Sequence, residues 1–241
     1  MVFRAPALAS AIAPGQFAMV DVPDRARPYL RRAYSVADAR PGEGEVEFLI
    51  KTIGPGTAAL EEIPVGSFVR LLGPLGNRFT IDDLPRGSRV AVVAGGIGVA
   101  PFPLLLKALT AAGLSADLYF GGRNAKELSL RARFDGLVPG DTILATDDGS
   151  LGEKGFVTEV LSRRLHAGTR YERVFACGPM PMFAALARVV ASAGVPAQFS
   201  TEAEMGCGFG ACLGCVIPGT EKPFIVSCSE GPILSPEKIQ W

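Results

Sequence analysis

The pattern of apolar and polar residues predicts two kinds of secondary structure along the chain. From residue 86 to about 197, short continuous apolar runs alternate with longer stretches of helical period. This alternation is typical of a parallel, doubly wound α/β sheet. The predicted strands span residues 89–94, 116–120, 141–145 and 173–176, and the predicted helices span residues 101–112, 157–165 and 181–193.

The pattern before residue 86 is different. Short stretches with strand character are separated by clusters of Gly, Pro and Asp, which favours an antiparallel β-barrel. These stretches span residues 16–22, 33–37, 45–51 and 67–72, while residues 1–13 are too few to predict an opening strand. The chain is therefore expected to be multidomain, with a barrel at residues 1–85, an α/β domain at 86–197 and a small domain at 198–241.

Composition narrows the possible partners. Hydrophobic residues make up 48% and charged residues 20% of the 241 positions, as in a globular protein with substantial cores. The 24 basic and 24 acidic residues give no net charge, so neither nucleic acid nor an anionic membrane surface is an expected partner. The longest uncharged apolar run, residues 90–106, is interrupted by glycines and prolines and makes a poor membrane span. With no targeting segment recognised, the expected location is the cytoplasm.

Four of the five cysteines lie close together near the C-terminus. Cys207, Cys212, Cys215 and Cys228 have the spacing C-x4-C-x2-C-x12-C, which is typical of the ligands of a plant-type [2Fe-2S] cluster. The backbone must wrap closely around such a centre, and four glycines allow this. They are Gly206, Gly208, Gly210 and Gly214.

Two other interpretations of these cysteines were weighed. A disulfide scaffold is disfavoured by the odd number of cysteines and by the lack of a secretory signal. A structural zinc site could also use four thiolates, although two separated C-x2-C pairs are more usual for zinc. The spacing favours the [2Fe-2S] cluster and leaves zinc as the alternative.

The α/β segment carries candidate nucleotide-binding residues. Gly95, Gly96 and Gly98 form a loop between a predicted strand and a predicted helix, where the backbone can approach a pyrophosphate. Cys177 follows the fourth predicted strand, at the end where such sheets bind ligands. Asp147 and Asp148 also follow a strand and either face an adenosine ribose or form a capped turn. Each of these features also has a purely structural interpretation, and a lone glycine loop is a weak signal.

The barrel segment contains residues suited to a flavin. Arg32, Tyr34 and Ser35 combine a guanidinium, an aromatic ring and a hydroxyl on one predicted strand, and an arginine can clamp a pyrophosphate. The turn 54–57 ends in Thr57 and resembles a helix start whose amides could face phosphate. The alternatives are surface arginines beside a core tyrosine, and an ordinary capped turn.

Taken together, these motifs resemble those of the ferredoxin-NADP reductase-like flavoproteins, and more narrowly the electron-transfer subunits of type B dihydroorotate dehydrogenases. The resemblance covers nearly the whole chain. The motifs that carry it are residues 32–35, 56–57, 72–77, 94–101, 146–150 and 177–179 and the four C-terminal cysteines.

The resemblance implies three cofactors: FAD in the barrel, NAD at the α/β domain and a [2Fe-2S] cluster in the C-terminal domain. By carry-over, the flavin and its phosphates would contact Arg32, Ala33, Tyr34, Ser35, Leu49, Ile50, Lys51, Gly56 and Thr57. Gly95, Gly96 and Gly98 would approach the nicotinamide nucleotide, and Cys177, near the nicotinamide, would be the candidate catalytic residue. Cys207, Cys212, Cys215 and Cys228 would hold the cluster. The chain departs from the family in a shorter N-terminus and in Ala33, where proline is common.

The implied function is electron transfer between NAD and a protein partner in pyrimidine (UMP) biosynthesis. A nicotinamide exchanges two electrons at once and an iron-sulfur cluster exchanges one, so a flavin is needed between them. The implied partner is a dihydroorotate dehydrogenase catalytic subunit carrying FMN, in a heterotetramer with two of each subunit. Arg123 could accept the 2′-phosphate of NADP, and only the family resemblance favours NAD.

Three other functions remain open at this stage. Two keep the cofactors and change the partner: a small subunit of a bifurcating NADH-dependent ferredoxin:NADP oxidoreductase, or of a hydrogenase or sulfhydrogenase. The third is a regulatory redox or zinc-binding module without turnover. The joint presence of flavin, nucleotide and cluster motifs favours a working enzyme over the third.

Overall fold

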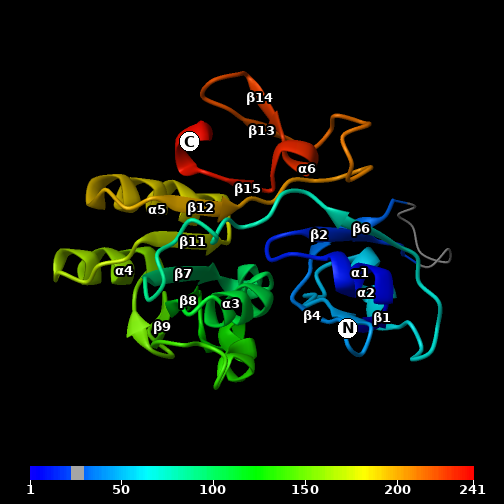
Figure 1. Ribbon diagram of the computed structural model, residues 1–241, viewed down its shortest axis with the longest axis horizontal. Coiled ribbons are helices and arrows are strands. Elements are labelled where there is room, and N and C mark those ends of the chain that lie inside the picture. The colour runs from blue at the N-terminus through cyan, green and yellow to red at the C-terminus, as the bar shows by residue number, and fades with distance from the viewer. Residues whose placement is uncertain (23–29) are drawn as a thin grey trace.

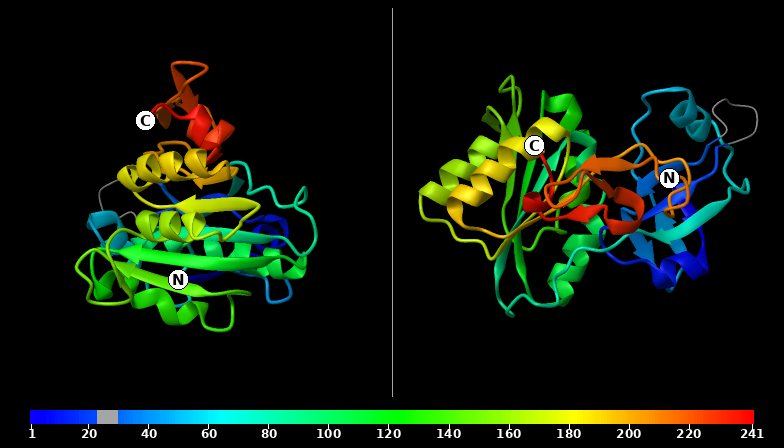
Figure 2. Two further views of the ribbon diagram at one scale, coloured as in Figure 1. Left: turned by 90° about the vertical axis from the view of Figure 1, so that its left-hand side faces the viewer. Right: turned by 90° about the horizontal axis from the view of Figure 1, so that it is seen from above.

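The computed structural model describes residues 1–22 and 30–241. It shows two lobes with the C-terminal segment lying across both of them (Figure 1; Figure 2, right). Within the described residues, no helix combines the length and the apolar composition that crossing a bilayer would require.

The first lobe is antiparallel, as predicted. Its strands form two three-stranded sheets with the orders β1-β5-β4 and β3-β2-β6. The strands are β1 (Val2–Arg4), β2 (Phe17–Val20), β3 (Arg32–Ser35), β4 (Asp38–Arg40), β5 (Glu45–Glu47) and β6 (Leu71–Leu75), and the helices are α1 (Pro6–Ala11) and α2 (Pro55–Glu61).

Three expectations for this lobe were wrong in detail. The opening residues do form a strand, β1, followed by α1. The strand predicted at 45–51 ends at Glu47. The Phe48 amide still donates to the Met1 carbonyl, but no described strand pairs with the residues that follow. The strand predicted at 67–72 begins only at Leu71, after a turn in which the Ser67 amide donates to the carbonyl of Pro64.

The second lobe contains a seven-stranded sheet with the order β10-β9-β8-β7-β11-β12-β15. All neighbouring pairs are parallel except β12 and β15. The strands are β7 (Arg89–Gly95), β8 (Ser115–Gly122), β9 (Thr142–Thr146), β10 (Glu153–Lys154), β11 (Arg173–Cys177) and β12 (Ala197–Ser200). The helices are η1 (Gly96–Val99), α3 (Phe102–Ala111), η2 (Ala125–Phe134), α4 (Val157–His166) and α5 (Met180–Ala193).

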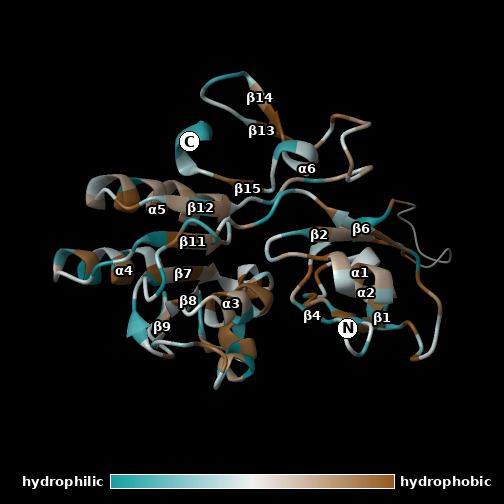
Figure 3. Ribbon diagram, viewed as in Figure 1, coloured by the Kyte–Doolittle hydropathy of each residue, from teal (hydrophilic) through white to brown (hydrophobic). Residues whose placement is uncertain are grey.

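Helices cover both faces of this sheet, which confirms the doubly wound arrangement. The helices α3 and η2 pack on one face and α4 and α5 on the other, each burying its own cluster of apolar side chains. Because both faces are covered, the inner strands are apolar nearly throughout (Figure 3). Burial on both faces of the sheet is thus the reason for the continuous apolar run at residues 89–94.

The C-terminal segment is tied to both lobes. It contains β13 (Val216–Pro218), β14 (Phe224–Val226), α6 (Ser227–Glu230), β15 (Ile233–Leu234) and η3 (Pro236–Lys238). The strand β15 pairs with β12 at the edge of the large sheet. Beside it, the Asn77 side chain donates to the Ile233 carbonyl and accepts from the Ile233 amide, both at 2.8 Å. These bonds hold the cysteine-bearing segment against the rest of the molecule.

Ion pairs fix the first lobe against the second. The Lys107 Nζ of α3 lies 2.7 Å from the buried carboxylate of Asp38, and Arg133 lies 2.7 Å from the buried carboxylate of Glu47. The Leu104 amide also donates to the Ala37 carbonyl at 2.8 Å. Because a buried carboxylate is costly without its partner, these contacts favour one relative position of the two lobes.

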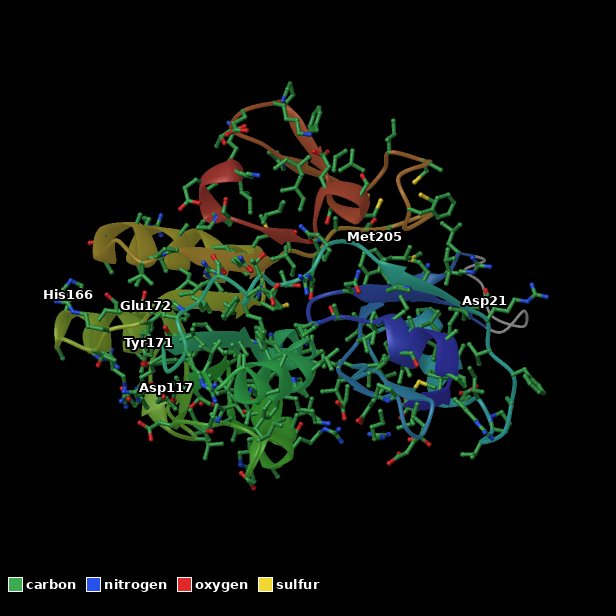
Figure 4. All side chains as sticks on the ribbon, in the orientation of Figure 1. Asp21, Asp117, His166, Tyr171, Glu172 and Met205 are labelled. Carbon is green, nitrogen blue, oxygen red and sulfur yellow. The ribbon has the colours of Figure 1, made fainter. Side chains whose placement is uncertain are left out.

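A second polar cluster lies at the amino ends of the parallel strands. Buried Asp117 accepts from the Tyr171 hydroxyl at 2.5 Å and from Arg89 at 2.7 Å. Asp117 and Tyr171 lie at the side of the second lobe, far from Met205 in the cysteine segment (Figure 4). Burial raises the pKa of Tyr171, so its hydroxyl remains a donor at neutral pH. The cluster joins neighbouring strands and lies away from the ligand-binding edge.

Candidate functional site

The glycine loop lies where the strand order of the large sheet reverses. The neighbours of β7 are β8 on one side and β11 on the other, and open sheets bind ligands at such a switch point. A Cβ at Gly98 would lie 2.6 Å from the carbonyl carbon of Cys177. Glycine is therefore required there for η1 to pack against the end of β11, and Gly95, Gly96, Gly98 and Cys177 are brought together as expected.

A cleft of about 930 Å³ opens at this edge of the sheet. Its walls include the three loop glycines, Gly178 after β11, and residues of α4 and α5. Lys51 of the first lobe and Glu202 of the C-terminal segment also line it. The volume is at the upper end of the range for small-molecule sites, and its glycine floor fits the backbone approach that a dinucleotide requires.

Cys177 is a buried, neutral thiol at the end of β11, directly before the cleft residue Gly178. Burial raises its pKa, Glu202 raises it further, and a hydrogen bond with Ser200 opposes the shift. A thiol with a raised pKa is a poor nucleophile, so Cys177 is suited to packing beside a ligand and not to covalent catalysis.

Glu202 is a cleft residue that sequence reasoning missed. It follows β12, the neighbour of β11, so it enters the cleft from the same edge of the sheet as Cys177. Its side chain faces the open cleft, and the surrounding protein raises its pKa by desolvation. The sequence did contain a signal for this position, because residues 197–200 follow the predicted helix 181–193 as a short strand. Recognising that strand would have placed Glu202 just after its carboxyl end, where such sheets bind ligands.

Glu127 is a second residue that the sequence did not reveal. Its carboxylate accepts from the Arg123 side chain at 2.5 and 2.9 Å and from the Arg123 amide at 3.1 Å. These bonds hold the pKa of Glu127 below its usual range. Arg123, expected as a possible phosphate ligand, is therefore paired with a carboxylate, and Asp147 adds another acidic group to the cleft.

The expected flavin residues are divided between two places. Arg32, Ala33, Tyr34 and Ser35 form β3, and the Tyr34 hydroxyl is buried without a hydrogen-bond partner in the structure. An unsatisfied buried hydroxyl is costly, so its position fits a cofactor that accepts a hydrogen bond there. Ile50 packs at the barrel core, and Leu49 lies half-buried between β5 and the cleft.

Lys51, the next residue along the chain, extends toward the second lobe. It reaches the nucleotide cleft, where its Nζ is 3.6 Å from Glu127. Lys51 is thus at the junction of the two lobes, a position that its sequence neighbours Leu49 and Ile50 did not predict.

The turn before α2 is a helix start, as expected. The Thr57 hydroxyl accepts from the amides of Ile53 and Gly54 and donates to the Gly54 carbonyl, all within 3.1 Å. Gly56 is buried in the first turn. The Thr57 hydroxyl is occupied by these local bonds, so a phosphate would meet the remaining free amides of this turn.

The four C-terminal cysteines form two pairs. The Cys212 amide points at the Cys207 sulfur and the Cys228 amide at the Cys215 sulfur, each at 3.4 Å, and the Gly210 amide lies 3.1 Å from the Cys228 sulfur. Backbone amides lower the pKa of Cys207 to about 6. Amides directed at sulfur stabilise thiolates and tune a bound cluster, so the donor set fits an iron-sulfur centre.

The pairing also bears on the zinc alternative. Among the described residues, no three His, Cys, Asp or Glu side chains are grouped to hold a single metal ion. Two thiolate pairs suit a two-iron centre, in which each iron takes two of the four ligands.

The four loop glycines differ in conformation. Only Gly208 and Gly210 have positive φ, whereas Gly206 and Gly214 leave room beside the Cys212 sulfur.

Comparison with known proteins supports this geometry. Residues 202–240 match the iron-sulfur cluster binding domain of dihydroorotate dehydrogenase B. The electron transfer subunit of dihydroorotate dehydrogenase B (NAD(+)) from Bacillus caldolyticus is 39% identical over 92% of this chain and 84% of its own length. The chain belongs to this family of electron-transfer subunits. The same subunit from Desulforamulus reducens is 36% identical over the whole chain and 92% of that protein.

The other domains of this family member match as well. Residues 2–79 match an oxidoreductase FAD-binding domain and residues 92–188 an oxidoreductase NAD-binding domain. The expected fold class and the three expected cofactors, FAD, NAD and an iron-sulfur cluster, are thereby confirmed. The domain limits and the individual site residues stay predictions.

Solved structures show the same fold. A structure of an NADH-dependent reduced ferredoxin-NADP oxidoreductase, described for flavin-based electron bifurcation, matches all of this chain and 84% of its own with a TM-score of 0.88 at 27% identity. A ferredoxin reductase of carbazole 1,9a-dioxygenase matches 78% of this chain and 59% of its own with a TM-score of 0.65 at 26% identity. The higher sequence identity lies with the dihydroorotate dehydrogenase subunits.

Proposed function

We propose that this chain carries electrons between NAD and a dihydroorotate-oxidising subunit that contains FMN, in pyrimidine biosynthesis. The observation that carries the proposal is the order of sites in one molecule. The nucleotide cleft meets the first lobe at Lys51, and the cysteines of the C-terminal segment pack against the sheet that contains β3. The three sites form a continuous series that ends at the molecular surface, at exposed Cys212.

Each part of the chain has a distinct role in this proposal. Arg32, Tyr34, Ser35 and the turn at Gly56 and Thr57 hold the flavin and its phosphates. When bound, the flavin exchanges a hydride with nicotinamide and single electrons with the cluster. The glycine loop accepts the nucleotide backbone, Cys177 packs beneath it at the end of β11, and Glu202 in the cleft can hold a proton. Cys207, Cys212, Cys215 and Cys228 ligate the cluster.

Glu127 supports the choice of NAD over NADP. It neutralises Arg123, which directly follows β8 and could otherwise hold a 2′-phosphate, and it adds negative charge beside Asp147. Glu127→Gln is expected to free Arg123 and to raise affinity for 2′,5′-ADP by at least about tenfold, the effect of one charged hydrogen bond. Affinity for 5′-AMP should change little. Calorimetric titration of both nucleotides measures the two affinities.

The control for this prediction is the double variant Glu127→Gln/Arg123→Ala, which lacks the freed guanidinium and should not gain affinity for 2′,5′-ADP. Equal affinities of the Glu127→Gln variant and the wild type for 2′,5′-ADP would contradict the assignment.

An apolar surface beside the cluster cysteines supports a protein partner at that point. Phe209 and Leu213 of the cysteine-bearing loop and Val216 and Phe224 of the β13–β14 hairpin all expose large side chains. Leu213 is 62% exposed and has φ of 55°, a strained conformation for leucine. Exposed apolar residues on a strained loop are typical of an interaction site.

Leu213→Asn tests this surface without straining the loop, because asparagine tolerates the left-handed conformation. The variant should keep the cluster and its own stability, but bind the FMN subunit at least about tenfold more weakly, since one buried leucine contributes about 1.5–3 kcal/mol. Biolayer interferometry with the purified partner measures the affinity. Phe68→Asn, which changes a fully exposed residue of the first lobe, is the matched control and should bind normally. Equal partner affinities of the Leu213→Asn and wild-type chains would exclude Leu213 from the interface.

We also propose a heterotetramer of two such chains and two FMN subunits, located in the cytoplasm. Cys177, the cysteine outside the proposed ligand set, forms no disulfide, which is compatible with a reducing compartment. Native mass spectrometry of the purified complex gives the stoichiometry directly.

The central test is an anaerobic assay of the complex captured from its own cells. Dihydroorotate should drive NAD reduction, and the activity should disappear when the partner is removed and return when it is added back. A coloured chain whose flavin is reduced by NADH, but whose complex ignores dihydroorotate, would overturn the proposal in favour of the bifurcating oxidoreductase, whose structure is similar along the whole chain.

A further inference from the structure

The two faces of the β3-β2-β6 sheet contact different parts of the molecule. Side chains alternate between the faces of a strand. Ala18, Val20 and Tyr34 pack in the core of the first lobe. On the opposite face Met19 and Ala33, which are paired across β2 and β3, pack with the cluster cysteines Cys215 and Cys228. This sheet therefore separates the flavin lobe from the cluster site by the thickness of one strand layer.

Met19 lies at the centre of the contact between the sheet and the cluster loop. It is fully buried and pairs with Ala33 of β3 on one side and with Leu72 of β6 on the other. A Cβ on Gly208 would lie 2.6 Å from Met19 Cγ and 2.8 Å from Met19 Sδ. Gly208 follows the ligand Cys207 directly, so the absence of a side chain there brings the cluster loop onto the methionine.

We propose that Met19 and Gly208 are positioning residues that set the distance between the flavin and the iron-sulfur cluster. The inference rests on the proposed placement of FAD at β3 and of the cluster at the four cysteines. Electron transfer between two centres slows steeply as their separation grows, so a loop held in van der Waals contact with the flavin sheet favours rapid transfer. Met19 lies on the strand between the two sites and touches both the cluster loop and the partner strand of Ala33.

FAD held at β3 would accept a hydride, and with it two electrons, from NADH. A cluster held by the four cysteines would then take one of these electrons, one ferric iron becoming ferrous, and the other would stay on the flavin. No covalent bond forms or breaks in this second step, so its rate depends on distance and driving force.

Gly208→Ala is the first test. Its Cβ would have to move by about 1 Å to reach an ordinary carbon contact with Met19, and this shifts the loop away from the sheet. A displacement of this size is expected to slow cluster reduction measurably, because electron transfer decays exponentially with distance. Stopped-flow mixing with NADH resolves flavin reduction from cluster reduction by absorbance, and only the second phase should slow.

Two further variants distinguish a longer distance between flavin and cluster from a general disturbance of the loop. Gly210→Ala carries the same backbone strain, since Gly210 has φ of 86° against 83° for Gly208, but its Cβ would meet only Ser229 at 3.4 Å. Any slowing in this variant measures the strain common to both. In Gly208→Ala/Met19→Ala the clashing atoms are gone, and the rate of cluster reduction should rise above that of Gly208→Ala, to the rate of Met19→Ala alone. Recovery in the double variant is an effect that general loss of stability would not produce.

The cluster must be present in every variant compared, which its electron paramagnetic resonance spectrum after dithionite reduction establishes. If wild-type protein transfers no electron from reduced flavin to the cluster, the proposed function fails. If wild-type protein transfers it and Gly208→Ala is no slower than Gly210→Ala, the function stands and the positioning role of Met19 and Gly208 is wrong. If Gly208→Ala cannot hold a cluster, the single variant Met19→Ala tests the inference instead. Removal of its contact with the loop should slow cluster reduction, and a wild-type rate would overturn the inference.

Discussion

Cys212→Ser is expected to remove the iron-sulfur cluster and to reduce dihydroorotate-driven NAD formation by the complex to background. Cys212 is the exposed member of the thiol set, and without it one iron would lack a thiolate ligand. Reduction of bound FAD by NADH should remain close to the wild-type rate, because the nucleotide cleft and β3 do not contain this residue. Visible absorption and the resonance spectrum report the cluster, and anaerobic stopped-flow reports the flavin.

The fifth cysteine is the matched control. Cys177→Ser changes a thiol that is buried at the end of β11, outside the cysteine-bearing loop. It should retain the full cluster spectrum and instead slow the reaction of NADH with the flavin. Partner-dependent NAD reduction at the wild-type rate by Cys212→Ser would show that the electrons take another route.

Gly98→Ala is expected to have the second large effect. The added Cβ would overlap the carbonyl group of Cys177, with its carbon at 2.6 Å, and neither backbone segment can move without disturbing the end of a central strand. Overpacking of this kind costs about 1–3 kcal/mol, and the displaced loop should weaken NADH binding on the order of tenfold or more. The NADH dissociation constant and the unfolding midpoint together measure the effect, with FAD and cluster content unchanged.

Gly96→Ala separates steric overlap from backbone strain. Gly96 has φ of 55°, so alanine there costs about 1–2 kcal/mol. Its Cβ would find no atom closer than the Glu127 carboxylate at 3.9 Å. This variant should lose stability but bind NADH better than Gly98→Ala does. The reverse order of affinities would mean that the contact between η1 and β11 does not shape the nucleotide site.

Local features of the sequence were sufficient for much of the fold. The central strands were predicted because burial on both faces makes them continuously apolar, as in β7 and β11. The glycine loop was predicted because a turn between a strand and a helix needs small residues. The cluster ligands were predicted because their spacing along the chain itself limits the centre that they can hold.

Other features depend on contacts between distant segments. Lys51 is predicted to lie beside the flavin with Leu49 and Ile50, and the sequence did not reveal that it also reaches the nucleotide cleft and Glu127. Glu202 was visible only as the start of the cysteine-rich stretch, and its place in the cleft follows from the pairing of β12 with β11. The limits of β5 and β6 were misjudged because a strand extends only as far as its neighbour does.

The sequence by itself thus determined the kinds of domain and the cofactor classes, and it predicted the four thiol ligands, since these depend on residue type and spacing within short segments. Only the tertiary structure decided how the sites are joined. The ion pairs of Asp38 and Glu47 and the contact of Met19 with Gly208 all link residues that are distant in sequence. Their physical cause is the burial of two lobes and a C-terminal segment against one another, which no local pattern encodes.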